Sequence, residues 1–466
     1  MRSSVPVVIV SLLGCLGLGC PPAAEQRPDP VPTLDNGPAK EPIPEVCDDA
    51  VLMAPMSAEQ TSYTRAFTRY AKLEDQYKSK LQARDVTAAY DLLLRMGRLA
   101  TRRLHKPDVA IAHFTEARTL ATQLGDQSKE ADALLLIGQA QIQRTIYQDA
   151  VGSLGQAQAL YKKLNMPIAE ARAMALSGVA HYYLKNQPKA VALVGQADNT
   201  VHALRSEDRQ VRMAQGRALM AIGAARNALG ESKRAEDAYQ EALAAFVATS
   251  YFREQAQALE EIAEIHAKAG HHEKAAAYYQ ECYAVWNKLG HSDGQADALV
   301  DLGDELFALG QKDLALNSFI KARALYEQLG QAGDSAAALG KMGKAYASLG
   351  QKAQAFASFF QALSMARSSQ RPTRLAAILH DVSATYSTMG DYEHAVRCSQ
   401  RAFQFWQELG EQDEAVQALT EVGDNYLKLG DLRGARDNYD RALGICRALL
   451  DLSCEATLRK RLDQAH

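Results

Sequence analysis

The sequence predicts an all-α protein built from stacked pairs of antiparallel helices, and three observations carry this prediction. Glycine recurs at every fortieth position over the C-terminal half of the chain. Between these glycines, apolar residues recur at three- and four-residue steps, the spacing of amphipathic helices. Alanine and leucine are abundant while aromatic residues make up only 7 % of the chain, which favours helices over strands. One helical pair cannot bury its apolar face alone, so the pairs must stack.

Several positions recur in phase with the glycine. A leucine stands eleven residues before it, followed four residues later by a small residue. An alanine stands five residues after the glycine, and a second small residue seven further on, with a large, usually aromatic residue between them. At that large position Ser399 is the exception. Small residues let two helices approach closely and large ones fill the space between them. Glycine suits a left-handed cap at the end of the first helix. The glycines are Gly230, Gly270, Gly310, Gly350, Gly390 and Gly430.

This pattern resembles the tetratricopeptide repeat, in a long form of forty residues. The resemblance implies a right-handed superhelical solenoid of about nine helix pairs, spanning residues 88–450. We expect a leading helix within residues 59–87 and a capping helix within residues 451–466, with Ser453 as its N-cap.

The N-terminus resembles a bacterial lipoprotein signal. Residues 1–20 combine Arg2 with an apolar stretch that is too short for a good transmembrane span. Two cysteines could carry the lipid, and Cys20 is favoured over Cys15 because it leaves a longer apolar stretch. An ordinary secretory signal is the alternative. The resemblance implies a lipid anchor in the cell envelope, and Pro21 after Cys20, in place of aspartate, indicates the outer membrane, facing the periplasm.

A proline-rich tether is expected to follow, within residues 21–58. Eight of the chain's 14 prolines lie in residues 21–45. Proline removes a backbone donor and clashes with the preceding turn, so this segment is expected to be a semi-extended spacer rather than a helix.

The seven cysteines are irregularly spaced and form no CxxC pair, which excludes a disulfide-dense scaffold. Cys446 and Cys454, eight residues apart, could bridge the last two helices in an oxidising compartment. Cys282 occupies a position that is alanine in neighbouring repeats, so we expect a packing role there rather than a nucleophile.

The sequence indicates no catalytic function. It contains no phosphate-binding loop, HExxH, GxSxG or kinase signature. His266, His271 and His272 lie around a turn without an obvious further ligand, so no metal or other cofactor is expected. The net charge of -3 provides no global basic field for nucleic acid.

In the tetratricopeptide family the first helix of each pair lines the concave, ligand-binding face. Neither the lysine-and-asparagine clamp for a C-terminal carboxylate nor the asparagine ladder of some relatives is present at the corresponding positions. The central part carries acidic residues and could favour a basic peptide, although a solvated face without preference is the simpler expectation. The residues expected on the concave face are Arg98, Gln139, Glu260, Glu264, Asp304, Lys344, His380 and Asp424.

These features predict a non-catalytic scaffold, anchored in the envelope membrane, that binds peptides or helices of other proteins. Two alternatives remain. One is a sensor that binds a peptide or small ligand and changes the pitch of the solenoid. The other is a metal-dependent enzyme around the three histidines, which metal analysis would test.

Overall fold

The part of the chain that the structure describes is helical, with twenty helices and no strands. The computed structural model describes residues 47, 65–102, 106–204, 206–368 and 372–465. The signal and tether predicted within residues 1–58 therefore lie outside the described residues, apart from Cys47. Among the described helices, none is long and apolar enough to cross a membrane.

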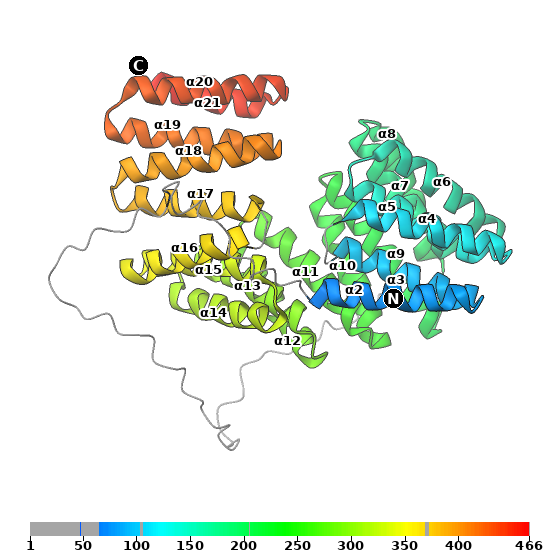
Figure 1. The fold of residues 1–466 in the computed structure, drawn as a ribbon. Coiled ribbons are helices and arrows are strands. Elements are labelled where there is room, and N and C mark those ends of the chain that lie inside the picture. The colour runs from blue at the N-terminus through cyan, green and yellow to red at the C-terminus, as the bar shows by residue number, and fades with distance from the viewer. Residues whose placement is uncertain (1–46, 48–64, 103–105, 205, 369–371, 466) are drawn as a thin grey trace, which may run out of the picture. The chain divides into compact units, whose positions relative to one another are not determined.

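The described helices form nine pairs, each a first helix followed by an antiparallel second helix (Figure 1). The leading helix is α2 (Arg65–Gln82). The first helices are α3 (Val86–Arg102), α5 (Gln127–Gln143), α7 (Pro167–Tyr183), α9 (Arg209–Ala228), α11 (Phe252–Lys268), α13 (Ser292–Ala308), α15 (Ala332–Ser348), α17 (Pro372–Thr388) and α19 (Gln412–Leu429). The second helices are α4 (Pro107–Gln123), α6 (Tyr147–Lys163), α8 (Gln187–Ala203), α10 (Ser232–Thr249), α12 (His272–Lys288), α14 (Lys312–Leu329), α16 (Lys352–Ser368), α18 (Tyr392–Leu409) and α20 (Leu432–Ala448). The last helix is α21 (Leu452–Gln464). Consecutive helices pack on one another along the series, which confirms the predicted all-α solenoid of helix pairs.

The recurring glycine ends each first helix from α9 onward in the left-handed conformation, as predicted. Gly310, for example, has a φ of 75°. The following amide of Gln311 donates to the carbonyl oxygen of Leu306 at 2.9 Å, which closes the helix end. In two earlier pairs Thr145 and Lys185 adopt the same conformation, each with a φ of 62°, so there a side chain with a Cβ occupies the position that favours glycine.

A ring on the second helix lies directly over the small residue of the first helix. A Cβ added to Gly303 would come within 2.4 Å of the Phe319 ring, and one added to Gly423 within 2.4 Å of the Tyr439 ring. The rings are buried, with Phe319 1 % exposed and Tyr439 fully buried. The glycine and the ring are therefore one packing unit, in which the missing side chain provides the room for the ring.

The exception at Ser399 is matched by a second change on its partner helix. Ser383 replaces the small glycine or alanine there, and both hydroxyls donate to the carbonyl oxygen of Ala395 at 2.9 Å. Two hydroxyl side chains that share one carbonyl acceptor thus replace the glycine and ring found in pairs such as Gly303 and Phe319.

The N-cap of α21 is Asp451 and not Ser453, so that prediction is wrong. The Asp451 side chain accepts the amides of Ser453 at 2.9 Å and Cys454 at 3.0 Å. An aspartate two residues earlier satisfies the free amides of the first turn equally well.

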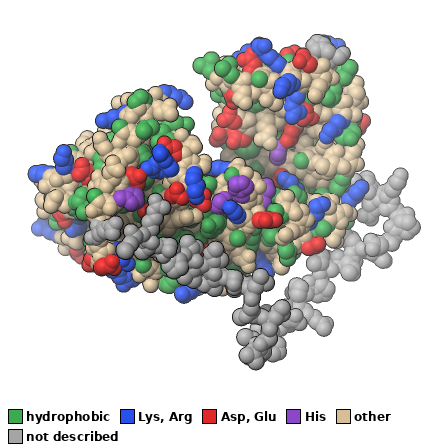
Figure 2. All heavy atoms as spheres, turned by 180° about the vertical axis from the view of Figure 1, so that it is seen from behind, with side chains coloured by type: hydrophobic (Ala, Val, Ile, Leu, Met, Phe, Trp, Pro, Cys, Tyr) green, Lys and Arg blue, Asp and Glu red, His purple; other side chains and the backbone are tan. Residues whose placement is uncertain are grey.

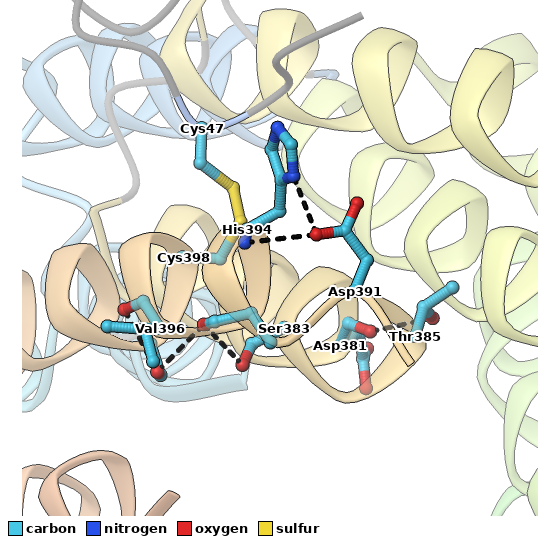
Figure 3. The surroundings of a disulfide bond; sticks show 10 residues. Cys47, Asp381, Ser383, Thr385, Asp391, His394, Val396 and Cys398 are labelled. Atoms are coloured by element: carbon cyan, nitrogen blue, oxygen red, sulfur yellow. Dashed lines mark hydrogen bonds and ion pairs between the residues drawn. A yellow bond between two sulfur atoms is a disulfide. The ribbon is translucent and has the colours of Figure 1, made fainter. Parts of the chain in front are cut away.

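Two disulfides involve helices of the C-terminal part. Cys446 of α20 is bonded to Cys454 of α21, and Cys47 is bonded to Cys398 of α18. Figure 3 shows the Cys47–Cys398 bond beside His394. The Nδ1 atom of His394 lies 2.7 Å from Asp391 Oδ1. The Cys47–Cys398 bond spans 351 residues and attaches residue 47 to the second helix of the eighth pair.

Candidate functional site

Equivalent positions of consecutive first helices come together on one surface, which we call the first-helix face. Lys341 of α15 reaches back to Asp304 of α13, with its Nζ 2.6 Å from Oδ2. Lys344, one turn further along α15, reaches forward to Asp381 of α17, with Nζ 3.7 Å from Oδ1. Opposite charges in successive pairs therefore join three consecutive first helices.

The row of ion pairs continues into α19. His380 Nδ1 lies 3.0 Å from Glu421 Oε2, and the hydrogen bond to Glu421 is the main reason why the pKa of His380 is raised despite burial. Asp424 accepts the hydroxyl of Tyr439 at 2.6 Å and forms an ion pair with Arg461 of α21. The charged side chains at this end are thus held by partners within the chain.

A cavity of about 500 Å³ lies between α19 and α21. Gln417, Glu421 and Asp424 line it from α19, while Leu458 and Arg461 line it from α21. Glu421, Asp424 and Arg461 are the ion-paired residues described above, and Asp451, which also lines the cavity, accepts the amides of the first turn of α21, so the charged groups of the cavity already have partners within the chain.

Carboxyl groups gather on α11 and α13. Burial raises the pKa of Asp301 to about 8, and the charges of Glu260, Asp304 and Asp297 raise it further while Lys341 opposes them. Asp297 in turn accepts the hydroxyl of Tyr326 at 2.8 Å. At neutral pH the Asp301 carboxyl therefore keeps its proton, so that it is a hydrogen-bond donor within an acidic surrounding.

The remaining predicted residues also lie on first helices. Arg98 is exposed on α3, Gln139 is half-buried on α5, and Glu260 and Glu264 are exposed on α11. Glu264 Oε1 accepts Lys268 Nζ at 2.7 Å, one turn further along the helix. The eight predicted residues are therefore distributed along the first-helix face. Asp304, Lys344, His380 and Asp424 are drawn into ion pairs there.

Several charged residues of this face were not predicted from the sequence. Asp301, Lys341 and Asp381 stand two residues before the small residue of their helices, and Arg172 and Arg217 stand six before it. The same repeat alignment, read at these two positions, carries the signal that would have found the missed residues.

The described residues show no arrangement for catalysis at the sites considered above. No group of three or more His, Cys, Asp or Glu side chains among them is placed to hold a metal ion. Burial lowers the pKa of His266, whose ring stacks on Tyr278 at 5.6 Å between centroids. Burial, and then the charge of Glu260, raises the pKa of the Cys282 thiol, which keeps it protonated.

Comparison with known families identifies the repeats. Tetratricopeptide-repeat models match residues 254–328, 336–369 and 374–448. These ranges are tetratricopeptide repeats. A comparison with curated protein sequences finds no match.

Solved structures with tetratricopeptide-type solenoids have a similar fold. The apo form of RapI superposes with a TM-score of 0.55 at 12 % sequence identity, covering 82 % of this chain and 99 % of RapI. A signal-transduction ATPase with numerous domains from Pyrococcus horikoshii, which carries a tetratricopeptide-repeat sensor, superposes with a TM-score of 0.52 at 15 % identity. That likeness covers 76 % of this chain and 54 % of the ATPase. At these identities the similarity concerns the fold.

Proposed function

We propose that this chain is a non-catalytic scaffold of the cell envelope that binds peptides or helices of partner proteins on its first-helix face. The observation that carries the proposal is the row of charged side chains on α13, α15, α17 and α19, which ion pairs between successive first helices hold in place. A surface with fixed charge positions discriminates between partners by complementary charge.

The ion-paired side chains of the first-helix face support a partner that is polar rather than a hydrophobic helix. In the view of Figure 2, acidic, basic and histidine side chains are interspersed, and hydrophobic ones are scattered among them. Glu260 and Asp297, which lie near the protonated and therefore neutral Asp301, form an acidic part of the face. A basic segment of a partner would be attracted there, chiefly through the rate of association.

Site-specific photocrosslinking of the full chain tests this proposal. A photoreactive residue would replace Glu264 or Asp304 on first helices, or the exposed Lys321 of α14 as a matched control on a second helix. Each protein would be exposed to a detergent extract of envelopes of the source organism. We expect a small, reproducible set of partners from the first-helix positions only. Equal capture from Lys321, or no capture from any position, would contradict the proposal.

Membrane attachment through a lipidated Cys20 is part of the same proposal. Its support is the signal-like sequence of residues 1–20, together with the two disulfides, which are typical of compartments outside the reducing cytosol. Metabolic labelling with a palmitate analogue tests it: label should persist in Cys15→Ser and disappear in Cys20→Ser. Loss of the label in Cys15→Ser, with label retained in Cys20→Ser, would place the anchor at Cys15. Absence of label from the parent and from both variants would indicate an ordinary secreted protein.

A sensor of peptides or small ligands is the second candidate. The similarity in fold to the P. horikoshii ATPase, whose repeat array is a sensor, favours it. In that case a small molecule or short peptide would co-purify with the full chain and raise its melting temperature, while photocrosslinking would capture no large partner.

A further inference from the structure

The turn between α20 and α21 exposes hydrophobic side chains to solvent. Leu450 is 85 % exposed and Leu452 is 79 % exposed, more than any other large hydrophobic residue that the structure describes. Leu449 beside them is also exposed, and we call residues 449–452 the leucine turn. Single exposed leucines are ordinary on a protein surface, whereas several in one turn form an apolar projection that indicates a contact with another molecule.

The fold itself does not require a leucine at position 450. Leu450 adopts the left-handed conformation, with a φ of 58°, which is unfavourable for a side chain with a Cβ. The other described second helices that end in this conformation carry glycine or a small polar residue there, namely Gly125, Asn165, Ser250, Gly290, Gly330 and Gly410. Unfavourable backbone conformations are concentrated at functional positions, so we looked for a role of this leucine outside the packing of the helices.

The leucine turn is held in place on both sides. Cys446 of α20 and Cys454 of α21, four residues before and after Leu450, are bonded to each other. Within the turn, Asp451 accepts the amides of Ser453 at 2.9 Å and Cys454 at 3.0 Å. Because the backbone of the turn is already ordered, the exposed leucines could bind an apolar environment with little further loss of conformational entropy.

Basic side chains surround the leucine turn. Arg447 Nε donates to Glu455 Oε1 at 3.1 Å, and Arg459 donates to the same oxygen at 2.6 Å. One carboxylate is therefore shared by two guanidinium groups, and both arginine side chains are more than half exposed. Residues 432–466 contain seven Lys and Arg against five Asp and Glu, whereas the whole chain has a net charge of -3. Exposed apolar side chains beside exposed basic ones are typical of segments that contact an anionic lipid surface.

The Cys47–Cys398 bond connects the proposed lipid anchor to the same part of the chain. It fixes residue 47 on α18, and α18, α19, α20 and α21 pack on one another in that order at one end of the described helices (Figure 1). The chain between Cys20 and Cys47 spans at most roughly 95 Å even when fully extended. A lipid on Cys20 would therefore keep the last helix pairs near the membrane. At the high effective concentration of a tethered group, even a weak contact with the bilayer is populated.

We propose that the leucine turn inserts into the surface of the lipid bilayer that carries the anchor, with Arg447 and Arg459 beside the phosphates of the headgroups. The guanidinium group presents paired donors that match phosphate oxygens, and the leucines lose their contact with water on insertion. This inference rests on the proposed function, because the lipidated Cys20 would bring the chain to the membrane. Two points of attachment, the lipid and the leucine turn, would restrict the rotation of the last helix pairs over the bilayer.

Photolabelling from within the bilayer tests the proposal. The full chain would be added to vesicles of phosphatidylethanolamine and phosphatidylglycerol that contain a phospholipid with a diazirine in its acyl chain. After illumination, reduction and alkylation, trypsin releases residues 448–459, which contain the leucine turn. It also releases residues 313–321 of α14 as a matched control, in which Leu314 is 54 % and Ile320 is 41 % exposed. We expect lipid label on the first peptide and none on the second. Equal label on both peptides, or none on the first, would overturn the proposal.

Variants separate insertion from a packing role. The double variant Leu450→Ser with Leu452→Ser should lower the label on residues 448–459 by roughly tenfold or more, because most of the inserted apolar area is lost. The control Leu314→Ser should leave this label unchanged. Leu450→Gly should also lower the label, while its melting temperature stays equal to that of the parent or rises, because glycine suits a φ of 58°. A lower melting temperature of Leu450→Gly with unchanged label would refute insertion and assign this leucine to packing.

Two further measurements separate this inference from the proposed anchor and from a protein contact. Palmitate on Cys20 with no lipid label on residues 448–459 would reject insertion of the leucine turn and retain the anchor. Lipid label on that peptide without palmitate would retain insertion and reject the anchor, and absence of both would reject both. A photoreactive residue in place of Leu452 that captures a second copy of the chain or another protein, without lipid label, would make the turn a protein interface and overturn the proposal.

Discussion

Substitution of one glycine in the ninth pair tests the packing of a ring against a missing side chain. In Gly423→Ala the added Cβ would lie 2.4 Å from the Tyr439 ring. The ring is fully buried and its hydroxyl is held by Asp424 at 2.6 Å, so it has little freedom to move aside. Overpacking of this kind costs about 1–3 kcal/mol.

The magnitude can be isolated with a second glycine in the same pair. Gly444 lies inside α20, and a Cβ added there would meet nothing within 4 Å. Replacement of a helical glycine by alanine stabilises a helix by about 1 kcal/mol, and both variants share this gain. The difference between Gly423→Ala and Gly444→Ala therefore measures the steric cost at the ring.

Hydrogen–deuterium exchange of α19 and α20, read by mass spectrometry, is the suitable assay because repeat arrays open locally rather than as one unit. Relative to the parent, Gly444→Ala should slow exchange by about fivefold, the effect of roughly 1 kcal/mol. Gly423→Ala should exchange faster than Gly444→Ala by about five- to a hundredfold. Equal protection of the two variants would show that the Tyr439 ring does not occupy the space over Gly423.

A double substitution gives an independent check of the same contact. Gly423→Ser with Tyr439→Ser would imitate the natural pair of Ser383 and Ser399. Its loss of stability should be smaller than the sum of the two single losses, since the clash in Gly423→Ser disappears with the ring. Additive losses would indicate that the two positions act independently.

Three further predictions concern titration, capping and covalent links. Because the pKa of Asp301 is raised to about 8 in the folded chain, the contribution of this carboxyl to stability falls as the pH rises from about 4 to about 8. Thermal unfolding measures this. The stability of Asp301→Asn relative to the parent should increase over that pH range and then level off. A stability difference that does not change with pH would contradict the burial of this carboxyl. Asp451→Ala should destabilise α21 by about 1 kcal/mol while Ser453→Ala has little effect, as followed by exchange of that helix, and the opposite order would restore Ser453 as the cap. Peptide mapping of the non-reduced chain should recover the two disulfides described above, with the buried Cys282 alkylated only after unfolding, and any other pairing would contradict the arrangement of α18, α20 and α21.

The fold could be predicted because the residues that pack against one another lie close together in the sequence, within one repeat. The forty-residue glycine marks the end of a first helix, and the small and large residues on either side of it meet within one pair, as Gly303 and Phe319 do. Contacts between positions that are far apart in the sequence are not indicated by the repeat pattern. The bond between Cys47 and Cys398 spans 351 residues, and no periodic feature of the sequence relates these two cysteines.

Local ambiguity explains the wrong cap of α21. Asp451 and Ser453 lie two residues apart, and both are residue types that accept free amides at a helix start. The choice between them depends on where the preceding turn ends, and Leu450 adopts a left-handed conformation there with a φ of 58°. A leucine gives no sequence signal for such a conformation, since it is unfavourable for a side chain with a Cβ.

The candidate site was the least predictable part because the repeat alignment identifies a face but not the partners of its side chains. Lys344 and Arg98 both belong to the predicted concave set and both carry a positive charge. Lys344 lies opposite Asp381 of the next pair, whereas Arg98 meets the charge of another arginine, Arg217. Charges of the first kind stabilise the stack of helix pairs and have little capacity left for a ligand. Arg98 is exposed, and the charges of Asp132 and Asp91 oppose the effect of Arg217 on its pKa, so it is not tied into the stack by an ion pair of the first kind. A search for binding positions in such an array should therefore compare the partners of each charged side chain, rather than its position in the repeat alone.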